Sequence, residues 1–230
     1  MAGHPLLREL LALVAPPACS ACRGPLAGAG AVLCPGCRAS VPWLLGRLCP
    51  RCALPLGPGS RRCPAREAPF SACWAAVAYE GVARELVLAC KFGGAFELAD
   101  LMAAQLAARL PAALSADAVL VPVPLPEARR RHRGFDQAAL LAERLGRRAG
   151  LPVRPCLRRT GRATRQLGAG RAERLERARL SLRVRGAVPP VALLVDDVHT
   201  TGATLAACAR ALRAAGSEEV RAVTYARTLA

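Results

Sequence analysis

Residues 191–205 read VALLVDDVHTTGATL, and this stretch decides the fold. Residues 191–195 form a short apolar run rich in β-branched residues, which predicts a buried strand. The acids Asp196 and Asp197 follow this strand, and a helical apolar pattern begins after Gly202. Ligands of open α/β sheets bind at the carboxyl ends of the strands. The paired acids and the turn that follows them therefore form a candidate ligand site.

The turn at residues 199–204 has the properties of an anion site. The free N–H groups and the dipole of the helix that follows it favour a negative charge. Gly202 allows the backbone to approach a ligand closely, and the threonine hydroxyls donate hydrogen bonds. The alternative is a capped helix preceded by two solvated acids. That alternative does not explain why both carboxylates directly follow a core strand.

The same string resembles the loop with which type I phosphoribosyltransferases bind 5-phosphoribosyl-1-pyrophosphate (PRPP). In that family two acids lie against the ribose hydroxyls, and a T-T-G-x-T turn holds the 5-phosphate. The resemblance implies that Asp196 and Asp197 are catalytic. It also implies that PRPP is bound by Val198, His199, Thr200, Thr201, Gly202, Ala203 and Thr204.

Length and composition are those of a globular chain. The 230 residues are enough for one medium-sized domain and a small one, and 53% of them are apolar. No apolar run approaches the ~18 residues that a membrane span needs. Residues 5–14 are interrupted by Arg8 and Glu9, which favours a short amphipathic helix over a secretory signal. We expect a cytoplasmic protein that does not insert into a membrane.

The positive charge is concentrated in one part of the chain. The net charge is +17, and residues 129–185, with 18 arginines and four acids, carry +14 of it. One interpretation is a surface for polyanions such as pyrophosphate, nucleotides or nucleic acid. The other is a solvated surface in a chain whose composition favours arginine, although such a bias does not explain the clustering.

The first four of the eleven cysteines have the spacing C-x2-C-x11-C-x2-C. Paired C-x2-C turns of this kind are typical of a tetrahedral zinc ribbon. A disulfide framework is the alternative, but it does not suit a cytoplasmic chain. We expect structural Zn²⁺ on Cys19, Cys22, Cys34 and Cys37.

A second cysteine set follows, but it is incomplete. Arg66 occupies the position where a fourth cysteine is expected. Cys73 is a candidate replacement, yet it lies in an alternating run typical of a strand, where a cysteine is ordinary core. We therefore expect a degenerate or weak second zinc site at Cys49, Cys52 and Cys63.

From about Cys73 onward, predicted strands alternate with predicted helices. This alternation indicates a mostly parallel sheet with helices on its faces. We expect an N-terminal helix and a double zinc ribbon over residues 1–70, and an α/β domain over residues 71–230. The strands are expected at 73–79, 117–123, 151–156, 191–195 and 219–225, and the helices at 82–92, 95–110, 135–149, 171–179 and 203–215.

Three further segments are candidates for the same site. The strand that leads to Val123 and Pro124 reaches the sheet edge at which Asp196 lies. Residues 129–133 place four arginines just before a helix, where an anion would meet guanidinium groups and a helix N-terminus. Lys91, the only lysine, ends a helix beside two glycines and is either a helix-terminal residue or a site residue.

The order of these pieces resembles the ComF family of bacterial competence systems, in which a double zinc ribbon precedes a phosphoribosyltransferase-like domain. The matching pieces are the cysteine pairs, KFGG at 91–94, VPVP at 121–124, RGFDQ at 133–137, Gln166 with RAER at 171–174, and the loop at 194–204. The resemblance implies a type I phosphoribosyltransferase fold and Mg²⁺ bound with PRPP. It further implies PRPP contacts from Lys91, Val123, Pro124 and Arg133.

The chain departs from the family pattern at two positions of interest. Arg66 stands where the family has a cysteine, and Asp136 stands where it usually has asparagine. The second change adds a negative charge beside the expected pyrophosphate site.

Two functions remain open from the sequence. The first is an enzyme that transfers the phosphoribosyl group to an acceptor that the sequence does not identify. The second is a non-enzymatic module, because ComF proteins are associated with uptake of single-stranded DNA and with a partner helicase. Such a module would sense PRPP or a nucleotide, or bind DNA. Only 3% of the residues are aromatic, so DNA contacts would be mainly to phosphate.

Overall fold

A computed structural model describes residues 17–26, 28, 30–57, 63–92, 95–159 and 182–229. The amphipathic helix expected at 5–14 and the short helix expected at 171–179 lie outside the described residues. The main elements are β1 (Ala72–Ala78), α3 (Gly81–Phe92), α4 (Ala95–Ala107), α5 (Ala112–Ser115), β2 (Val119–Pro122), α6 (Glu127–Arg133), α7 (Gln137–Ala149), β3 (Leu157–Arg159), β4 (Leu182–Val184), β5 (Val191–His199), α9 (Ala203–Ala214) and β6 (Glu219–Arg227), preceded by the short helix α2 (Pro35–Ala39).

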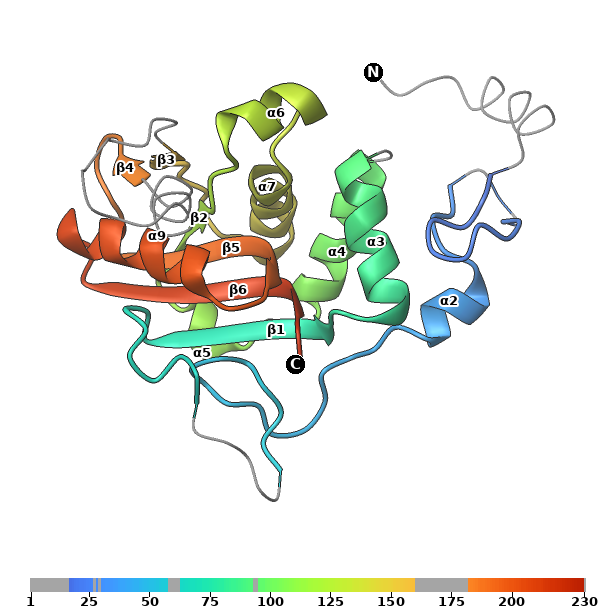
Figure 1. Ribbon diagram of the computed structural model, residues 1–230, viewed down its shortest axis with the longest axis horizontal. Coiled ribbons are helices and arrows are strands. Elements are labelled where there is room, and N and C mark those ends of the chain that lie inside the picture. Colours follow the sequence, from blue (N-terminus) through green and yellow to red (C-terminus); the bar gives the residue numbers. More distant parts are fainter. Residues whose placement is uncertain are drawn as a thin grey trace, which may run out of the picture.

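The centre of the molecule is a four-stranded parallel sheet in the order β1-β6-β5-β2. Residues 192–195 of β5 are fully buried, because helices cover both faces of the sheet (Figure 1). A strand buried on both faces has a continuous apolar sequence rather than an alternating one. The prediction of a mostly parallel α/β fold preceded by a zinc ribbon is confirmed.

Two apolar cores lie on the two faces of the sheet. One contains Leu86 of α3, Met102 of α4 and Leu145 of α7, packed against Leu193. The other contains residues of α9, packed against sheet residues such as Leu194. Figure 1 shows α3, α4 and α7 on one face and α9 on the other.

The two cysteine-containing segments pack against different cores. Cys19 and Leu33 of the first segment belong to the core with α3 and α4. Ala53 and Phe70 of the second segment belong to the core with α9. The boundary expected between residues 70 and 71 falls just before β1, and backbone bonds cross it, for example from Cys73 N to Pro50 O at 2.8 Å.

Two sequence-based boundaries need correction. The expected strand at 151–156 is a single parallel bridge between Val153 and Leu120, and the regular strand β3 begins only at Leu157. The arginines at 129–133 do not precede a helix in a loop but form the helix α6 themselves. Their run has no apolar periodicity and so gave no helical signal, although arginine has a high intrinsic helix propensity.

The other elements predicted within the described residues are present, with ends shifted by a few residues. None of the described helices combines the length and the apolar character that a membrane crossing requires.

Candidate anion-binding cleft and zinc sites

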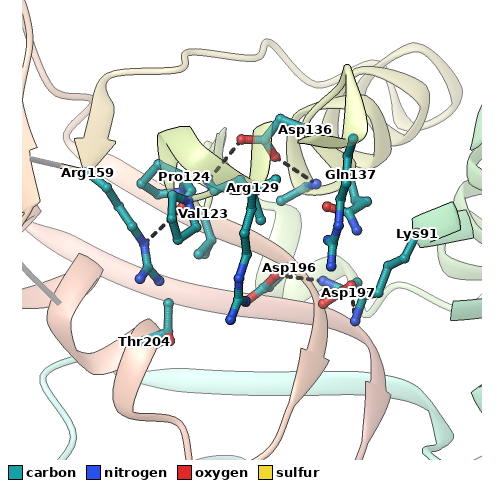
Figure 2. Close-up of a pocket in the computed structure, with 14 residues that line it drawn as sticks. Lys91, Val123, Pro124, Arg129, Asp136, Gln137, Arg159, Asp196, Asp197 and Thr204 are labelled. Atoms are coloured by element: carbon teal, nitrogen blue, oxygen red, sulfur yellow. Dashed lines mark hydrogen bonds and ion pairs between the residues drawn. The ribbon is translucent and has the colours of Figure 1, made fainter. Parts of the chain in front are cut away.

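A polar cleft lies at the carboxyl edge of the sheet, with a volume of about 160 Å³. It lies where β2 ends beside the carboxyl-terminal part of β5, because Pro122 pairs with Val195 and Val123 N donates to Val195 O at 2.9 Å. This pairing brings the 123–126 loop beside the acids of β5. The lining residues are Lys91, Val123, Pro124, Leu125, Pro126, Arg129, Arg133, Asp136, Gln137, Ala138, Arg159, Asp196, Asp197 and Thr204 (Figure 2).

The two acids are part of β5 rather than of the turn that follows it. The strand continues through Asp196, which pairs with Thr224 of β6. Lys91 Nζ forms an ion pair with Asp197 Oδ2 at 3.0 Å, and both side chains are largely buried. Lys91 therefore lines the cleft as well as lying in the last turn of α3.

The two carboxylates have different surroundings. Burial raises the pKa of Asp196 well above its ordinary value, and the charge of Asp197 adds to this effect. Lys91 acts in the opposite direction. A partly buried carboxylate with a raised pKa in a cleft is a common feature of functional sites.

The buried side chain of His199 packs against the turn that follows β5. Its imidazole is 2% exposed, and its Nδ1 lies 3.3 Å from Cys73 Sγ of β1. Burial, with a smaller effect from Arg227, lowers the pKa of His199 to about 4, so the ring is neutral at physiological pH. Gly202 adopts φ +78°, and a Cβ on it would lie 2.8 Å from His199 Nε2. Only glycine fits this turn without displacing the imidazole.

The opposite wall of the cleft is cationic. Arg129 and Arg133 come from α6, and Arg159 ends β3 with its Nε donating to Pro124 O at 2.9 Å. Figure 2 shows Arg129 reaching toward Asp196 and Arg159 reaching toward Thr204. The sequence analysis did not identify Arg159 as a site residue, because nothing distinguishes it from the other arginines of a basic segment.

Backbone N–H groups donate hydrogen bonds to the carboxylate of Asp136. Its Oδ1 accepts hydrogen bonds from Ala138 N and Ala139 N as the N-cap of α7. Its Oδ2 accepts from Leu125 N at 2.9 Å. The additional charge relative to asparagine therefore lies at a helix N-terminus, where a carboxylate is favourable.

Gln137 is a second residue that the sequence did not single out for the site. It is 5% exposed, and its Nε2 has no hydrogen-bond partner among the described residues. Gln137 lines the cleft and, together with Asp197, a small apolar cavity of about 10 Å³ behind it. A buried amide donor without a partner is available to an oxygen of a ligand or of an ordered water.

The structure brings seven of the predicted site residues into the cleft lining. The remaining turn residues adjoin it, with Thr200 and Thr201 exposed and His199 packed underneath. The seven are Lys91, Val123, Pro124, Arg133, Asp196, Asp197 and Thr204.

The first cysteine set forms a compact group of four sulfur atoms, all within 4.8 Å of one another. Backbone N–H groups point at the sulfurs, for example Cys34 N at 3.4 Å from Cys19 Sγ. Burial raises the pKa of Cys19, but these backbone bonds outweigh it and lower the value to about 6. Burial and the neighbouring thiols raise the pKa of Cys37 to about 12. Four cysteine sulfurs this close together can hold a cation, and their number and spacing fit tetrahedral zinc.

The second cysteine set repeats the backbone of the first. Arg23 and Ala53, which follow the second cysteine of each pair, both adopt positive φ, at 63° and 58°. Ala53 N donates to Cys49 O, as Arg23 N does to Cys19 O, both at 2.9 Å. The sulfurs of Cys49, Cys52 and Cys63 lie within 4.8 Å of one another and fit a metal ion.

A fourth cysteine does not complete this group among the described residues. Cys73 lies in β1 with its Sγ on His199, as the strand pattern indicated. The loop that carries Arg66 is instead held by Arg51, whose guanidinium donates to carbonyl oxygens of Ala65, Arg66 and Ala68.

Comparisons with known proteins agree with these features. Residues 10–67 match the double zinc ribbon domain. The chain is 34% identical over 113 residues to "Competence protein F" of Haemophilus influenzae, which covers 47% of this chain and 49% of that protein. It is 39% identical over 95 residues to "Competence protein ComFC" of Bacillus subtilis, which covers 41% of this chain and 38% of that protein. The matched region thus spans half or less of these two relatives.

A third relative matches over nearly the whole chain. The "DNA utilization protein YhgH" of Salmonella typhi is 32% identical over 230 residues, which covers 94% of this chain and 100% of that protein. The chain belongs to the ComF family. This ComF protein carries structural Zn²⁺ sites, supported by the double zinc ribbon match and by the two cysteine groups.

Proposed function

We propose that the cleft binds PRPP together with Mg²⁺, and that the protein is a phosphoribosyltransferase-like ComF protein acting in DNA uptake or utilization. One observation carries the proposal. The paired acids Asp196 and Asp197 lie in the carboxyl-terminal part of a parallel strand that leads into a glycine turn, and they face arginines across one cleft. This arrangement matches a phosphorylated sugar with a second anionic group at its far end.

Each wall of the cleft suits one part of that ligand. The N–H groups and hydroxyls of the turn bind the 5-phosphate, and the carboxylates accept hydrogen bonds from the ribose hydroxyls. Arg129, Arg133 and Arg159 face the pyrophosphate, where guanidinium groups bind phosphate oxygens through paired hydrogen bonds. The carboxylates also offer the oxygen ligands that Mg²⁺ prefers, and the ion would screen the charge of the pyrophosphate.

In a transfer reaction the bond between C1 of ribose and the pyrophosphate oxygen breaks, and pyrophosphate leaves with the electron pair. An acceptor then forms the new bond to C1. Fixed cations stabilise the charge on the leaving group, and the carboxylates stabilise the cationic character of the ribose. The acceptor is not specified by the residues of the cleft.

The test is calorimetry with Mg²⁺-PRPP at low salt, followed by measurement of pyrophosphate release with a set of nucleobases. We expect binding by the wild type and its loss in the double variant Asp196→Asn, Asp197→Asn, with the fold retained. Asp100→Asn is the matched control, since Asp100 is an exposed acid of α4 paired with Arg148. If the wild type does not bind millimolar PRPP, the proposal fails.

The second candidate is a non-enzymatic module that binds single-stranded DNA or a partner such as a helicase, with the fold as a phosphate or nucleotide sensor. The observation in its favour is the surface of α6, on which Arg129, Arg130 and Arg131 are all exposed. The names of the relatives also refer to competence and to DNA utilization.

Changing Arg129, Arg130, Arg131 and Arg133 to glutamine distinguishes the two functions. If the protein is a DNA-binding module, its affinity for single-stranded DNA falls in this variant. The slope of log affinity against log salt then becomes shallower by about 0.7 per lost phosphate contact. Unchanged DNA affinity with lost PRPP binding would assign the cluster to the small-molecule site alone. The control changes four exposed arginines on separate helices, Arg38, Arg84, Arg147 and Arg210, to glutamine.

A further inference from the structure

Arg227, the last residue of β6, is a charged side chain buried beneath the candidate phosphate turn. It is 3% exposed and pairs in register with His199 of β5. Its Nη1 donates to the carbonyl oxygens of His199 at 2.9 Å and Thr200 at 2.6 Å. These two residues begin the turn, so one guanidinium fixes the backbone from which the turn departs.

The other side of the same guanidinium contacts the second cysteine set. Arg227 Nε donates to Cys52 O at 2.8 Å, within the C-x2-C pair. The thiols of Cys52 and Cys63 also interact electrostatically with the guanidinium. None of the carboxylates that the structure describes forms an ion pair with Arg227. Among the described residues, the acidic groups that interact electrostatically with this buried guanidinium are thus cysteine thiols, those of Cys52, Cys63 and Cys73.

We propose that Arg227 is a positioning residue that couples metal binding at Cys49, Cys52 and Cys63 to ligand binding at the turn of residues 200–204. This inference rests on the proposed function, because it assigns PRPP to that turn. A divalent metal ion on three thiolates carries a net charge of −1, which offsets the buried positive charge. Metal binding also fixes the C-x2-C backbone whose carbonyl accepts the Nε bond.

The geometry explains why this position holds arginine. A guanidinium presents several N–H donors in a rigid plane, so it bonds carbonyls on opposite sides at the same time. Lysine at this position would keep the charge but lose the simultaneous contacts. Because coupling between two sites is reciprocal, PRPP should in turn strengthen retention of the second metal ion.

The test is a double-mutant cycle on the full-length chain, with Mg²⁺-PRPP affinity measured by calorimetry. Cys63→Ser weakens the second metal site, and Arg227→Lys removes the connection while keeping the charge. Each single variant should weaken PRPP binding by about 10-fold, a typical coupling magnitude. The double variant should bind as weakly as Arg227→Lys alone, because the contribution of the metal no longer reaches the turn.

Arg221→Lys is the matched control, since Arg221 lies on the same strand and donates to the backbone carbonyls of Leu114 and Ala116, none of which lines the cleft. It should leave PRPP affinity within about twofold. Additive losses in the double variant, or an equal loss in Arg221→Lys, would overturn the proposal. Circular dichroism and zinc content of each variant establish that the rest of the chain remains folded.

A second measurement works without PRPP. Amide hydrogen exchange at residues 200–204 is compared before and after stripping of the second metal ion with a chelator, in the wild type and in Arg227→Lys. We expect stripping to accelerate exchange in the wild type and to change nothing further in the variant. If the wild type binds no PRPP but its exchange follows the metal, the proposed function fails and the coupling stands. If amide exchange at residues 200–204 in the wild type does not change when the metal ion is removed, the proposed coupling fails.

Discussion

Asp196 is a residue whose proposed role in ligand binding comes at a cost to the stability of the fold. Burial and the charge of Asp197 raise its pKa well above the ordinary value. Above the unfolded pKa of about 3.9, the folded protein therefore binds more protons at this group than the unfolded chain does. Its contribution to stability falls as the pH rises toward the folded pKa.

Asp196→Asn should therefore stabilise the protein while abolishing PRPP binding. We expect a free energy of unfolding above that of the wild type at pH 8, measured by urea titration with circular dichroism. The gain should shrink as the pH falls and disappear below about pH 3, where the wild-type carboxyl is protonated in both states. A variant less stable than the wild type at pH 8 would show that the ionised carboxylate is stabilising.

Gly202 gives a second prediction at this scale. Gly202→Ala places a Cβ 2.8 Å from His199 Nε2 at a φ of +78°. The left-handed backbone alone costs about 1–2 kcal/mol for alanine, and displacement of the imidazole should distort the turn as well. PRPP affinity should fall by more than about 10-fold, or about 1.4 kcal/mol.

Gly150→Ala is the control for that experiment. Gly150 has a similar φ of +68°, but a Cβ there meets nothing within 4 Å. It should lower the free energy of unfolding by about 1–2 kcal/mol with PRPP affinity unchanged. Equal ligand losses in both variants would mean that backbone strain alone, and not the contact with His199, is responsible.

Residues inside a local motif were predictable from the sequence, whereas those supplied by distant segments were not. Asp196, Asp197 and Lys91 stand in recognisable strings, and the structure joins Lys91 to Asp197. Arg159 and Arg227 act through contacts set by strand register and burial, which one arginine among many does not reveal.

The helices α6 and α7 show the same difference at the scale of elements. The amphipathic pattern of α7 was sufficient to predict that helix. In contrast, α6 has no apolar face, and only the residues at its two ends mark it as a helix. Pro126 precedes its first turn, and Gly134, in the left-handed conformation, ends it. Asp136 then connects the start of α7 to the 123–126 loop through Leu125 N.

Asp136→Asn tests that connection. Asparagine keeps one oxygen for Ala138 N and Ala139 N, but its amide nitrogen faces the Leu125 N–H, which then lacks an acceptor. We expect a loss of about 1–2 kcal/mol in the free energy of unfolding, measured by urea titration. Glu143→Gln, on the exposed part of α7, is the control with no expected loss. A variant as stable as the wild type would assign no structural role to the Leu125 contact.

At the scale of the whole molecule, the zinc ribbons are part of the packing of the sheet. The first supplies Cys19 and Leu33 to one core, and the second supplies Ala53 and Phe70 to the other. The cysteine spacing predicted the first site. The sequence did not show that the incomplete second set keeps the same backbone as the first, because Arg51 holds the loop that carries Arg66 through contacts with carbonyl groups that only the fold brings together.

Cys34→Ser should release the zinc of the first set and destabilise more than the ribbon. Structural zinc contributes about 10–16 kcal/mol in small ribbons, and loss of the ribbon uncovers the apolar surface of α3 and α4. Elemental analysis should give one zinc ion fewer per chain than the wild type, and hydrogen exchange should accelerate in α3 as well as in residues 17–40. Acceleration confined to the ribbon would show that the sheet core is independent of it.

The strand order β1-β6-β5-β2 also has a consequence for folding during synthesis. The first strand pairs with the last one, so β1 has no neighbour in this sheet until residues 219–227 have left the ribosome. The zinc ribbons are synthesised before the sheet and can bind metal early, whereas the sheet against which their apolar surfaces pack closes only after β6 has been synthesised. Such long-range pairing slows folding and prolongs the time during which apolar surface is exposed and can aggregate. Early metal loading would limit the number of misfolded forms that the nascent chain can reach.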